Sequence, residues 1–463
     1  MATPKKIAVL VHNNVLRDAR VRKQARTLVE AGHKVDVFGF SLDGAVYPST
    51  IEGGARLKIE PRKIPNTLLK VFSVLSGLLT GSRVGRAMFA LLILSLLYSL
   101  LVSIALVVLI APWLAAPLIA VLALFVLGGL LCLAALVFKR QYIRDWVQVN
   151  WGFAAISRPL ARNVIGKDYD VVHCHDMIAM MAGEMIKKQD PQITLIWDAH
   201  ELYTELSYKT PYVGKLTGKM IARIAPRVDK MVTISPSFVA LYAERYPKLP
   251  KAEVVMNATR RPTSLEVNRA LLRDAAGVSA DQKVLLFQGG VSHGRGVGLL
   301  LEAAAHMPKH WSLVFMGFGP MLAEVEATAA KLNGARPKDA PAIAVVPPAP
   351  QDVLRDWTSG ADLGVIPYEN TSLNHLYCTP NKLWEYPNAR VPILATDLVE
   401  MAEIITQNGT GTLLPRDFTA ADIVSALDRI TEAQLETWRN NCDVFNETEN
   451  WEKFEPNLLR AYA

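Results

Sequence analysis

The chain has 463 residues, of which 51% are hydrophobic and 20% charged, with a mean hydropathy of +0.20 and a formal charge of +7. This composition is too apolar for an ordinary soluble chain and too charged for a protein built of many membrane spans. The 27 Pro, 28 Gly and four scattered Cys, with no CxxC pair, exclude disorder, collagen, a disulfide scaffold and a zinc site. They predict a reducing compartment.

The charge is divided unevenly along the chain. Residues 1–250 contain 31 Lys and Arg against 17 Asp and Glu, whereas residues 251–463 contain 19 against 26. A basic half is typical of a surface that faces an anionic membrane, where each nearby Lys or Arg contributes about 1 kcal/mol. A solvated basic surface is the alternative. No nucleic-acid partner is predicted, because the basic residues are not grouped with stacking aromatics.

The first apolar run, residues 7–11 within a strand expected over 6–11, is too short for the core of a signal peptide. It predicts a buried strand, which a helix over 20–31 and a strand over 34–38 follow. The turn between that first strand and the helix, residues 12–18, contains no Gly. This argues against the dinucleotide-binding turn of an NAD-dependent oxidoreductase.

The apolar excess lies in residues 87–138, which are 52 residues without one Asp, Glu, Lys, Arg or His. Pro112 and Pro117 divide the segment into limbs, 87–111 and 118–138, of about 37 and 31 Å as helices, enough to cross a bilayer core of about 30 Å. Basic residues flank both ends, so the positive-inside rule predicts a hairpin with both soluble parts on the cytoplasmic face of the inner membrane.

A re-entrant hairpin and two buried core helices are the alternatives, because the turn of the hairpin carries no polar residue besides Trp113. The flanking segments mix apolar, aromatic and basic side chains. Residues 64–86 and 139–160 therefore predict helices that lie in the membrane interface.

The remaining sequence alternates β-branched runs with helical patterns, which predicts an α/β fold of two Rossmann-like domains with parallel sheets. We expect the N-terminal domain over 1–250, with the hairpin inserted, and the C-terminal domain over 251–445. Residues 247–250 and 254–262 predict a linker. A ligand cleft is expected between the domains, outside the carboxyl ends of their strands. The further predicted strands are 170–173, 194–197, 230–234, 283–288, 312–316, 342–346, 363–367 and 391–396, and the helices are 215–225, 236–245, 297–306, 321–332, 351–360 and 381–386.

A Gly-rich turn, residues 289–296, follows the first predicted strand of the second domain. Its spacing mimics a Walker A motif, but Arg295 and Gly296 stand where Lys and Ser or Thr are required, so no Mg-ATP site is predicted. Glycine amides, the start of the next helix and Arg295 predict a site for a diphosphate. An ordinary Gly-rich connection is the alternative.

A second cluster runs from Asn374 to Tyr386, where a loop enters a helix. Amides at the start of that helix and Lys382 would hold phosphate, and Glu385 one turn further would suit a ribose diol. A solvated Lys–Glu salt bridge is the alternative.

A third cluster, residues 198–201, follows a strand of the first domain, and His173 and His175 follow the preceding strand. A histidine at a strand's carboxyl end faces the cleft, so His200 could bond a sugar hydroxyl or transfer a proton. A structural histidine is the alternative. The Asp-Tyr-Asp run at 168–170 resembles a metal-binding motif but lies at the entry of its strand, so no metal is expected.

Together these residues resemble the GT-B glycosyltransferases of glycosyltransferase family 4. The matching pieces are the opening strand with residues 17–26, residues 198–201, Asn257, residues 289–296, 316–320 and 361–386. The resemblance implies a nucleotide-diphosphate sugar held mainly by the second domain. It implies retaining transfer with no metal or cofactor, and a C-terminal helix within 446–463 that crosses back to the first domain.

The resemblance also implies the site residues. Arg295 and Lys382 would contact the diphosphate, Glu385 the ribose, and His200 the donor sugar, and these four are the catalytic candidates. The donor-binding candidates are Gly289, Gly290, Gly317, Gly319, Pro347, Asn374, Tyr377, Cys378, Thr379 and Asn381. The candidates on the acceptor side are Asn14, Arg17, Asp18, His175 and Glu201.

Two positions depart from the family pattern. Tyr377 stands where the family has the first of two glutamates, and Gly290 stands where the family often has Arg. These departures leave an inactive relative as an alternative.

The position of the hairpin within the acceptor-side domain predicts a lipid-linked acceptor. A polyprenyl-diphosphate glycan or a glycolipid would fit, and the product would enter a surface polysaccharide or glycoconjugate. A soluble-acceptor transferase that docks at the membrane is one alternative. A non-catalytic membrane scaffold or sugar-nucleotide sensor is the other.

Overall fold

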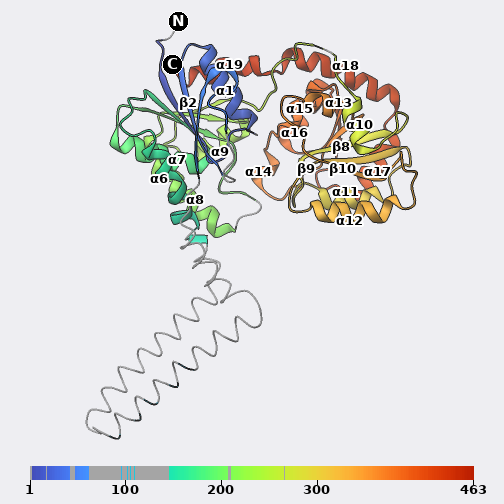
Figure 1. Ribbon diagram of the computed structural model, residues 1–463, viewed down its shortest axis with the longest axis horizontal. Helices are drawn as coiled ribbons and strands as arrows, with labels where there is room; N and C mark the ends of the chain where they lie inside the picture. Colours follow the sequence, from blue (N-terminus) through green and yellow to red (C-terminus); the bar gives the residue numbers. More distant parts are fainter. Residues whose placement is uncertain are drawn as a thin grey trace. The chain divides into compact units, whose positions relative to one another are not determined.

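The computed structural model describes residues 3–16, 18–41, 47–61, 148–206, 210–264 and 266–463, together with a few isolated positions between 95 and 146 (Figure 1). Residues 1–60 and 156–463 form one compact unit, and residues 61–155 form another. The first unit contains two parallel sheets, each with its own covering helices.

The first sheet has seven strands in the order β3-β2-β1-β4-β5-β6-β7. Its pairings from β2 to β7 are parallel, with Ile7 opposite both Val35 and Val171. The strands read as apolar runs because both faces of the sheet are covered. Their bounds are β1 Lys6–Leu10, β2 Lys34–Ser41, β3 Arg56–Pro61, β4 Val171–His175, β5 Thr194–Ala199, β6 Lys230–Thr233 and β7 Ala252–Val254.

The second sheet has six parallel strands in the order β10-β9-β8-β11-β12-β13. In both sheets the strand order reverses next to the first strand of the domain, at β1/β4 and at β8/β11. Ligands of open α/β sheets bind outside the carboxyl ends of strands at such a reversal. The bounds are β8 Lys283–Gly290, β9 Trp311–Phe318, β10 Ile343–Val346, β11 Leu363–Ile366, β12 Ile393–Thr396 and β13 Gly411–Leu414.

The α-helices that connect and cover the strands include several with side-chain caps, such as α1, where Asp18 accepts from the Val21 amide. In the first domain they are α1 Ala19–Glu30, α6 Phe153–Arg162, α7 Asp176–Gln189, α8 Pro211–Ile224 and α9 Pro236–Arg245. In the second they are α10 Ala270–Ala276, α11 Val297–Ala304, α12 Leu322–Asn333, α13 Leu354–Ser359, α14 Leu373–Leu376, α15 Lys382–Asn388, α16 Val399–Asn408, α17 Ala420–Arg429 and α18 Glu432–Thr448.

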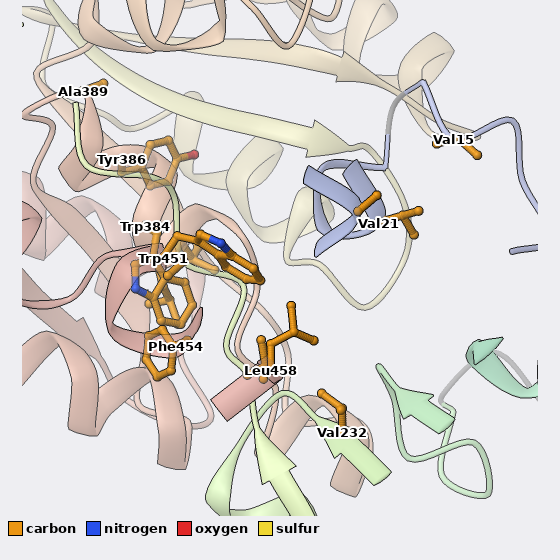
Figure 2. Close-up of a cluster of buried hydrophobic side chains, with 14 of the residues drawn as sticks. Val15, Val21, Val232, Trp384, Tyr386, Ala389, Trp451, Phe454 and Leu458 are labelled. Atoms are coloured by element: carbon orange, nitrogen blue, oxygen red, sulfur yellow. The ribbon is translucent and has the colours of Figure 1, made fainter. Parts of the chain in front are cut away.

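The last helix, α19 (Trp451–Arg460), packs on elements of the first domain. Trp451 donates its indole N–H to Thr27 Oγ1 in α1 at 2.8 Å, and Asn457 donates to the Val254 carbonyl at 2.7 Å. In Figure 2, Trp451, Phe454 and Leu458 lie beside Trp384 and Tyr386 of α15, in one buried apolar cluster. The chain therefore closes across both domains through apolar burial, the main driving force of such packing.

The predicted fold class is confirmed, since both domains are parallel α/β sheets. Most predicted elements lie within a few residues of the observed ones. The edge strand β7 overlaps the start of the predicted linker at Val254, and six further elements were not predicted, namely β3, α7, α10, α14, α16 and β13. The α7 sequence, rich in Met and Ala, is buried along most of its length, so it lacks the polar face that marks an amphipathic helix.

The apolar segment 87–138, apart from isolated helical positions such as Tyr98 and Leu109, lies outside the described residues, as do residues 64–86. Of the predicted interfacial helix at 139–160, the described part includes a π-helical turn over Gln148–Gly152 and the start of α6. Within the described residues, no helix is both long enough and apolar enough to span a membrane.

Candidate functional site

The carboxyl ends of β8 and β9 meet through glycines. Gly289 has φ +107°, and a Cβ added to Gly317 would lie 1.9 Å from the Gly289 carbonyl oxygen. A Cβ added to Gly319, with φ +153°, would lie 2.2 Å from the Val291 carbonyl oxygen. Only glycine allows these backbones to approach so closely. These glycines place no side chain of their own over the carboxyl end of β8, which leaves room for a ligand.

Two cations converge over this turn. A Cβ on Gly289 would lie 2.8 Å from Lys382 Nζ, and a Cβ on Gly290 would lie 2.8 Å from Arg295 Nη1. Arg295 is held over the Tyr368 ring, 5.4 Å from its centroid. Lys382 begins α15 and Arg295 belongs to the loop before α11, so the fold brings together two charges that are distant in sequence. Adjacent cations of this kind suit the two phosphates of a diphosphate.

The Glu385 carboxylate lies one helical turn beyond Lys382. Its Oε2 accepts a hydrogen bond from Gln288 Nε2 at 2.7 Å, and Gln288 Oε1 in turn accepts from Thr358 Oγ1 at 2.7 Å. Gln288 and Thr358 are buried, so this chain of bonds holds one carboxylate oxygen in place. Gln288 was not among the predicted site residues. Its position could have indicated a site residue, because it is a polar residue at the end of an apolar strand, directly before the Gly turn.

A pocket of about 870 Å³, a size typical of small-molecule sites, is lined by Lys382, Glu385 and the glycines of β8, and Arg295 lies behind Gly290 outside the lining residues. Phe318, with 53% of its surface exposed, lies on one wall. Pro347, predicted to contact the donor, is exposed and the next three residues line the pocket in its place. The pocket is lined by Leu16, Arg22, Pro48, Thr50 and Ile51 of the first domain, which sequence analysis missed, and by Gln288, Gly289, Gly290, Met316, Phe318, Pro348, Ala349, Pro350, Gln351, Asp352, Leu354, Asn381, Lys382 and Glu385.

The start of α11 differs from the expectation that it would help to bind an anion. The Gly296 amide donates to Glu369 Oε1 at 3.1 Å, and a Cβ on Gly296 would lie 2.0 Å from the Pro367 carbonyl oxygen. The Glu369 carboxylate therefore already accepts the hydrogen bond that this amide could donate to an anion. The positive charge at the turn comes from Arg295 and Lys382.

Several predicted donor-binding residues contact the first domain. Asn374 Oδ1 accepts from the Leu202 amide at 2.7 Å, and Thr379 donates to the Ile234 carbonyl at 3.1 Å. The Tyr377 carbonyl accepts from Ser235 Oγ at 3.3 Å, and burial raises the pKa of the neighbouring Cys378 thiol to about 12. These bonds hold the loop before α15 against the first domain. Asn381, also predicted, does line the pocket.

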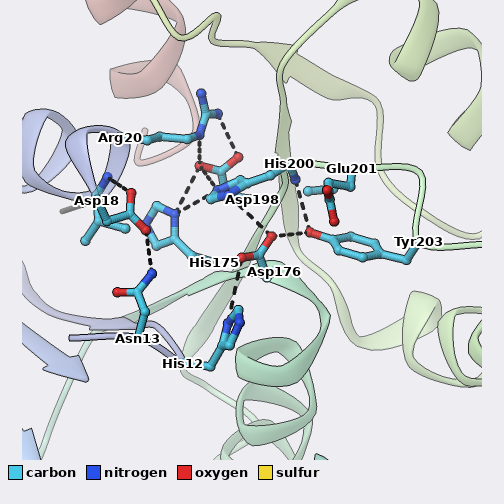
Figure 3. Close-up of polar contacts among 12 residues, drawn as sticks. His12, Asn13, Asp18, Arg20, His175, Asp176, Asp198, His200, Glu201 and Tyr203 are labelled. Carbon is cyan, nitrogen blue, oxygen red and sulfur yellow. Dashed lines mark hydrogen bonds and ion pairs between the residues drawn. The ribbon is translucent and has the colours of Figure 1, made fainter. Parts of the chain in front are cut away.

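The first domain contributes a buried ion pair at the carboxyl end of β5. Arg20 of α1 donates to both oxygens of Asp198, at 2.7 and 2.8 Å, and to the Val255 carbonyl at 2.6 Å (Figure 3). Gln24 donates a further bond to Asp198 at 2.7 Å. Burial alone would raise the pKa of Asp198, but Arg20 and His200 hold it well below its usual range.

His200 lies between two carboxylates. Its Nδ1 is 3.3 Å from Asp176 Oδ1 and its Nε2 is 3.4 Å from Asp198 Oδ2 (Figure 3). Burial alone would lower the pKa of His200, but Asp176 and Asp198 raise it to about 9. His200 is therefore an imidazolium at neutral pH, and both of its ring nitrogens face protein groups.

The predicted acceptor-side residues have different surroundings. Asp18 caps α1 and accepts from Asn13 at 2.8 Å, whereas His175 is fully buried behind His200, with its Nδ1 3.1 Å from His200 Nε2. Burial and the neighbouring His173 lower the pKa of His175 well below its usual range. Asn14 and Glu201 are partly exposed, and Arg17 lies outside the described residues.

Three of these buried groups have the residue types and spacing of a metal site. Ligand atoms of His173, His175 and Asp198 lie within 4.8 Å of one another. Both Asp198 oxygens already accept from Arg20, and His173 Nδ1 is bonded to the Tyr462 hydroxyl. The guanidinium neutralises the one carboxylate of the set, so these residues do not fit a cation well. The Asp-Tyr-Asp run has other contacts, since Tyr169 donates to Asp36 and Asp170 accepts from the Lys6 amide.

We predict that Arg20→Met destabilises the protein by about 3–5 kcal/mol, because it leaves the Asp198 charge buried without its partner. Arg26→Met on the same helix is the matched control. Arg26 pairs with Glu30 through side chains that are 40% and 44% exposed, so this change should cost about 0.5 kcal/mol or less. Urea unfolding of both variants measures the difference, and equal losses would contradict the assignment.

The pKa of His200 gives a pH dependence. The raised pKa adds stability that is fully present below pH 6.5, the unfolded value, and is lost as pH rises to about 9. Lys23, whose pKa burial lowers to about 7, acts in the opposite direction over much of this range. The expected signal is therefore the difference between wild type and His200→Gln, measured as Tm against pH. Parallel curves from pH 6.5 to 9 would refute the raised pKa.

Two family models match parts of the chain. Residues 132–259 match the model of Glycosyltransferase Family 4, and residues 282–433 match that of Glycosyl transferases group 1. A D-inositol 3-phosphate glycosyltransferase of Xylanimonas cellulosilytica is 25% identical over 282 residues, which is 56% of this chain and 63% of that protein. The chain thus covers less than two thirds of the curated relatives it matches.

Solved structures share the fold. Anabaena HepE in complex with UDP-glucose superposes with a TM-score of 0.64 at 11% identity, covering 99% of each chain. WaaG, a glycosyltransferase involved in lipopolysaccharide biosynthesis, gives 0.52 at 15% identity, covering 98% of each. The chain therefore shares the fold of these structures, and two of its segments, residues 132–259 and 282–433, are similar to glycosyltransferase families.

Proposed function

We propose that the protein is a glycosyltransferase that moves a sugar from a nucleotide-diphosphate sugar to a lipid-linked acceptor. The observation that carries this proposal is that Lys382 and Glu385 line one pocket with Gly289 and Gly290, while Arg295 lies beside Gly290. The similarity of the chain to glycosyltransferases supports the same reading.

The donor binds in the 870 Å³ pocket in this proposal. Lys382 and Arg295 contact the diphosphate, Glu385 accepts from the ribose hydroxyls, and Phe318 lies against the base. As the bond to the sugar breaks, negative charge grows on the leaving diphosphate, and the two fixed cations stabilise it. The transfer proceeds with retention and without a metal. UDP is the first nucleotide to test, because the similar HepE structure holds UDP-glucose.

His200 is proposed to act near the donor sugar. With the ring held between Asp176 and Asp198, a direct bond to a sugar hydroxyl requires the ring to exchange one carboxylate for the ligand. Asp18 and His175 support the loop and the ring. Asn14, Arg17 and Glu201 remain proposed acceptor contacts.

The acceptor proposal rests on the composition of residues 87–138. A segment of 52 residues without charge, inside a half of the chain with excess Lys and Arg, supports attachment at an anionic membrane on its cytoplasmic face. WaaG, which shares the fold, is involved in lipopolysaccharide biosynthesis. A non-catalytic sugar-nucleotide sensor is the rival function, since Tyr377 replaces a family glutamate.

We predict that Lys382→Gln weakens UDP binding by about ten- to a hundredfold, because a hydrogen bond to a charged group contributes about 1.5–3 kcal/mol. Calorimetric titration measures this, with the exposed Lys309→Gln as a control that leaves the affinity unchanged. Equal UDP affinity in wild type and Lys382→Gln would contradict the donor assignment. UDP binding without any transfer of labelled glucose from UDP-glucose to a membrane lipid fraction would favour the sensor.

We predict that the full chain sediments with vesicles containing phosphatidylglycerol, whereas a chain lacking residues 87–138 stays in solution. UDP affinity shows whether the shortened chain is folded. A second variant, Leu96→Lys with Leu124→Lys, keeps the segment but places charges in it, each of which costs about 3 kcal/mol in a membrane helix. Unchanged sedimentation of both variants would contradict membrane attachment through this segment.

A further inference from the structure

A second cavity, of about 220 Å³, adjoins the donor pocket. It lies between α1, residues 257–260, α13 and α15, and it shares five lining residues with the larger pocket, namely Arg22, Gln351, Leu354, Asn381 and Glu385. Ligand pockets for whole small molecules usually measure about 300–1,000 Å³, so this cavity suits one small group. Its lining residues are Ala19, Arg22, Lys23, Asn257, Thr259, Arg260, Gln351, Leu354, Arg355, Thr358, Asn381, Glu385 and Asn388.

The cavity is strongly basic. Arg22, Lys23, Arg260 and Arg355 line it, and the one carboxylate among the lining residues is that of Glu385. Burial lowers the pKa of Lys23 to about 7, and the positive charges of Arg20 and Arg260 add to this effect. Among the cations that line the cavity, Lys23 and Arg260 are thus close enough to repel one another, and Glu385 offsets part of this repulsion. An anion in the cavity would relieve that repulsion.

Two guanidinium nitrogens at the cavity have no acceptor among the described residues. Nε of Arg260 and Nη2 of Arg355 are buried from solvent and make no hydrogen bond. Leaving a buried charged donor without a partner costs free energy, so such atoms are rare in folded proteins. These two nitrogens are closed off from the cavity itself, which the same side chains line through their other atoms.

The remaining contacts of these side chains hold them in place. Arg355 donates through Nε to the Asn388 carbonyl at 2.9 Å, and Arg260 pairs with Glu455 at 3.2 Å. Lys23 donates to the Ala258 carbonyl. Each cation is thus oriented by one set of atoms while it also faces the cavity. Pre-oriented donors bind an anion without a further ordering cost.

We propose that this cavity is an anion subsite that binds a phosphate group, separate from the donor diphosphate contacts of Lys382 and Arg295. The phosphate comes either from a phosphate group of the acceptor or from free inorganic phosphate. Both sources present the same tetrahedral oxyanion to Arg260 and Arg355.

The experiment uses the full chain carrying Lys382→Gln and Arg295→Gln, so that phosphate does not bind at the donor contacts. Inorganic phosphate is titrated by calorimetry into this protein and into the same protein with Arg355→Gln. Arg355→Gln should weaken binding by about ten- to a hundredfold, since it removes a hydrogen bond to a charged ligand. Arg429→Gln, an exposed arginine on α17, is the matched control and should change nothing.

Lys23→Gln is the second variant, in case Arg355→Gln does not fold, and thermal unfolding checks both. No phosphate binding in the parent protein, or equal binding with and without Arg355 and Lys23, would overturn the proposal. Because the donor contacts are already removed, this result does not depend on whether the protein is a UDP-sugar transferase.

Glucose 6-phosphate and glucose distinguish the two sources of phosphate. Tighter binding of glucose 6-phosphate than of inorganic phosphate supports a phosphorylated acceptor, and the reverse order supports a free anion. Glucose itself should not bind in either case. Binding of glucose that equals that of glucose 6-phosphate would contradict an anion subsite.

Discussion

The buried pair between Arg20 and Asp198 is the interaction on which most of the site depends. Its guanidinium joins three parts of the fold, because it also donates to the Val255 carbonyl and to Asn257 Oδ1, where the chain leaves the first sheet. Asn257 donates in turn to the Thr379 carbonyl in the second domain, at 3.3 Å. A charge this deeply buried needs its partner in place, so the pair orders α1, β5 and the chain between the domains together.

Asp176 and the same Asp198 carboxylate together determine the charge of His200. Asp176 and Asp198 keep His200 protonated. Behind it, the uncharged His173 and His175 stack on each other, with their ring centroids 4.5 Å apart. The Arg20 guanidinium thus stabilises the buried charge of Asp198. The Asp176 and Asp198 carboxylates in turn stabilise the charged form of His200. The electrostatics of the first domain differ from those of the second, where Lys382 lines a pocket that is open to ligand and Arg295 lies beside Gly290 of its wall.

The loop before α15 shows how contact between the domains forms the donor pocket. Asn374 and Thr379 bond backbone groups of the first domain, and this places Asn381 and Lys382 at the pocket wall. Asn374 and Thr379 match the family's donor-binding motif, but they do not line the pocket. They hold in place the residues that do, Asn381 and Lys382. Glu369 at the Gly296 amide is a similar case, since it occupies a donor that the motif assigned to phosphate.

Periodicity and glycine spacing in the sequence determined the parallel α/β class, the Gly turn at 289–296 with Arg295 beside it, and the identity of Lys382 and Glu385 as pocket residues. These follow from local rules, because strands alternate with helices and their carboxyl ends meet at one edge of a sheet. Only the tertiary structure decided which polar atoms are already bonded within the protein. Gln288 beside Glu385, Leu202 beside Asn374 and the unpartnered nitrogens of Arg260 and Arg355 depend on contacts between distant segments, and no local pattern encodes such contacts.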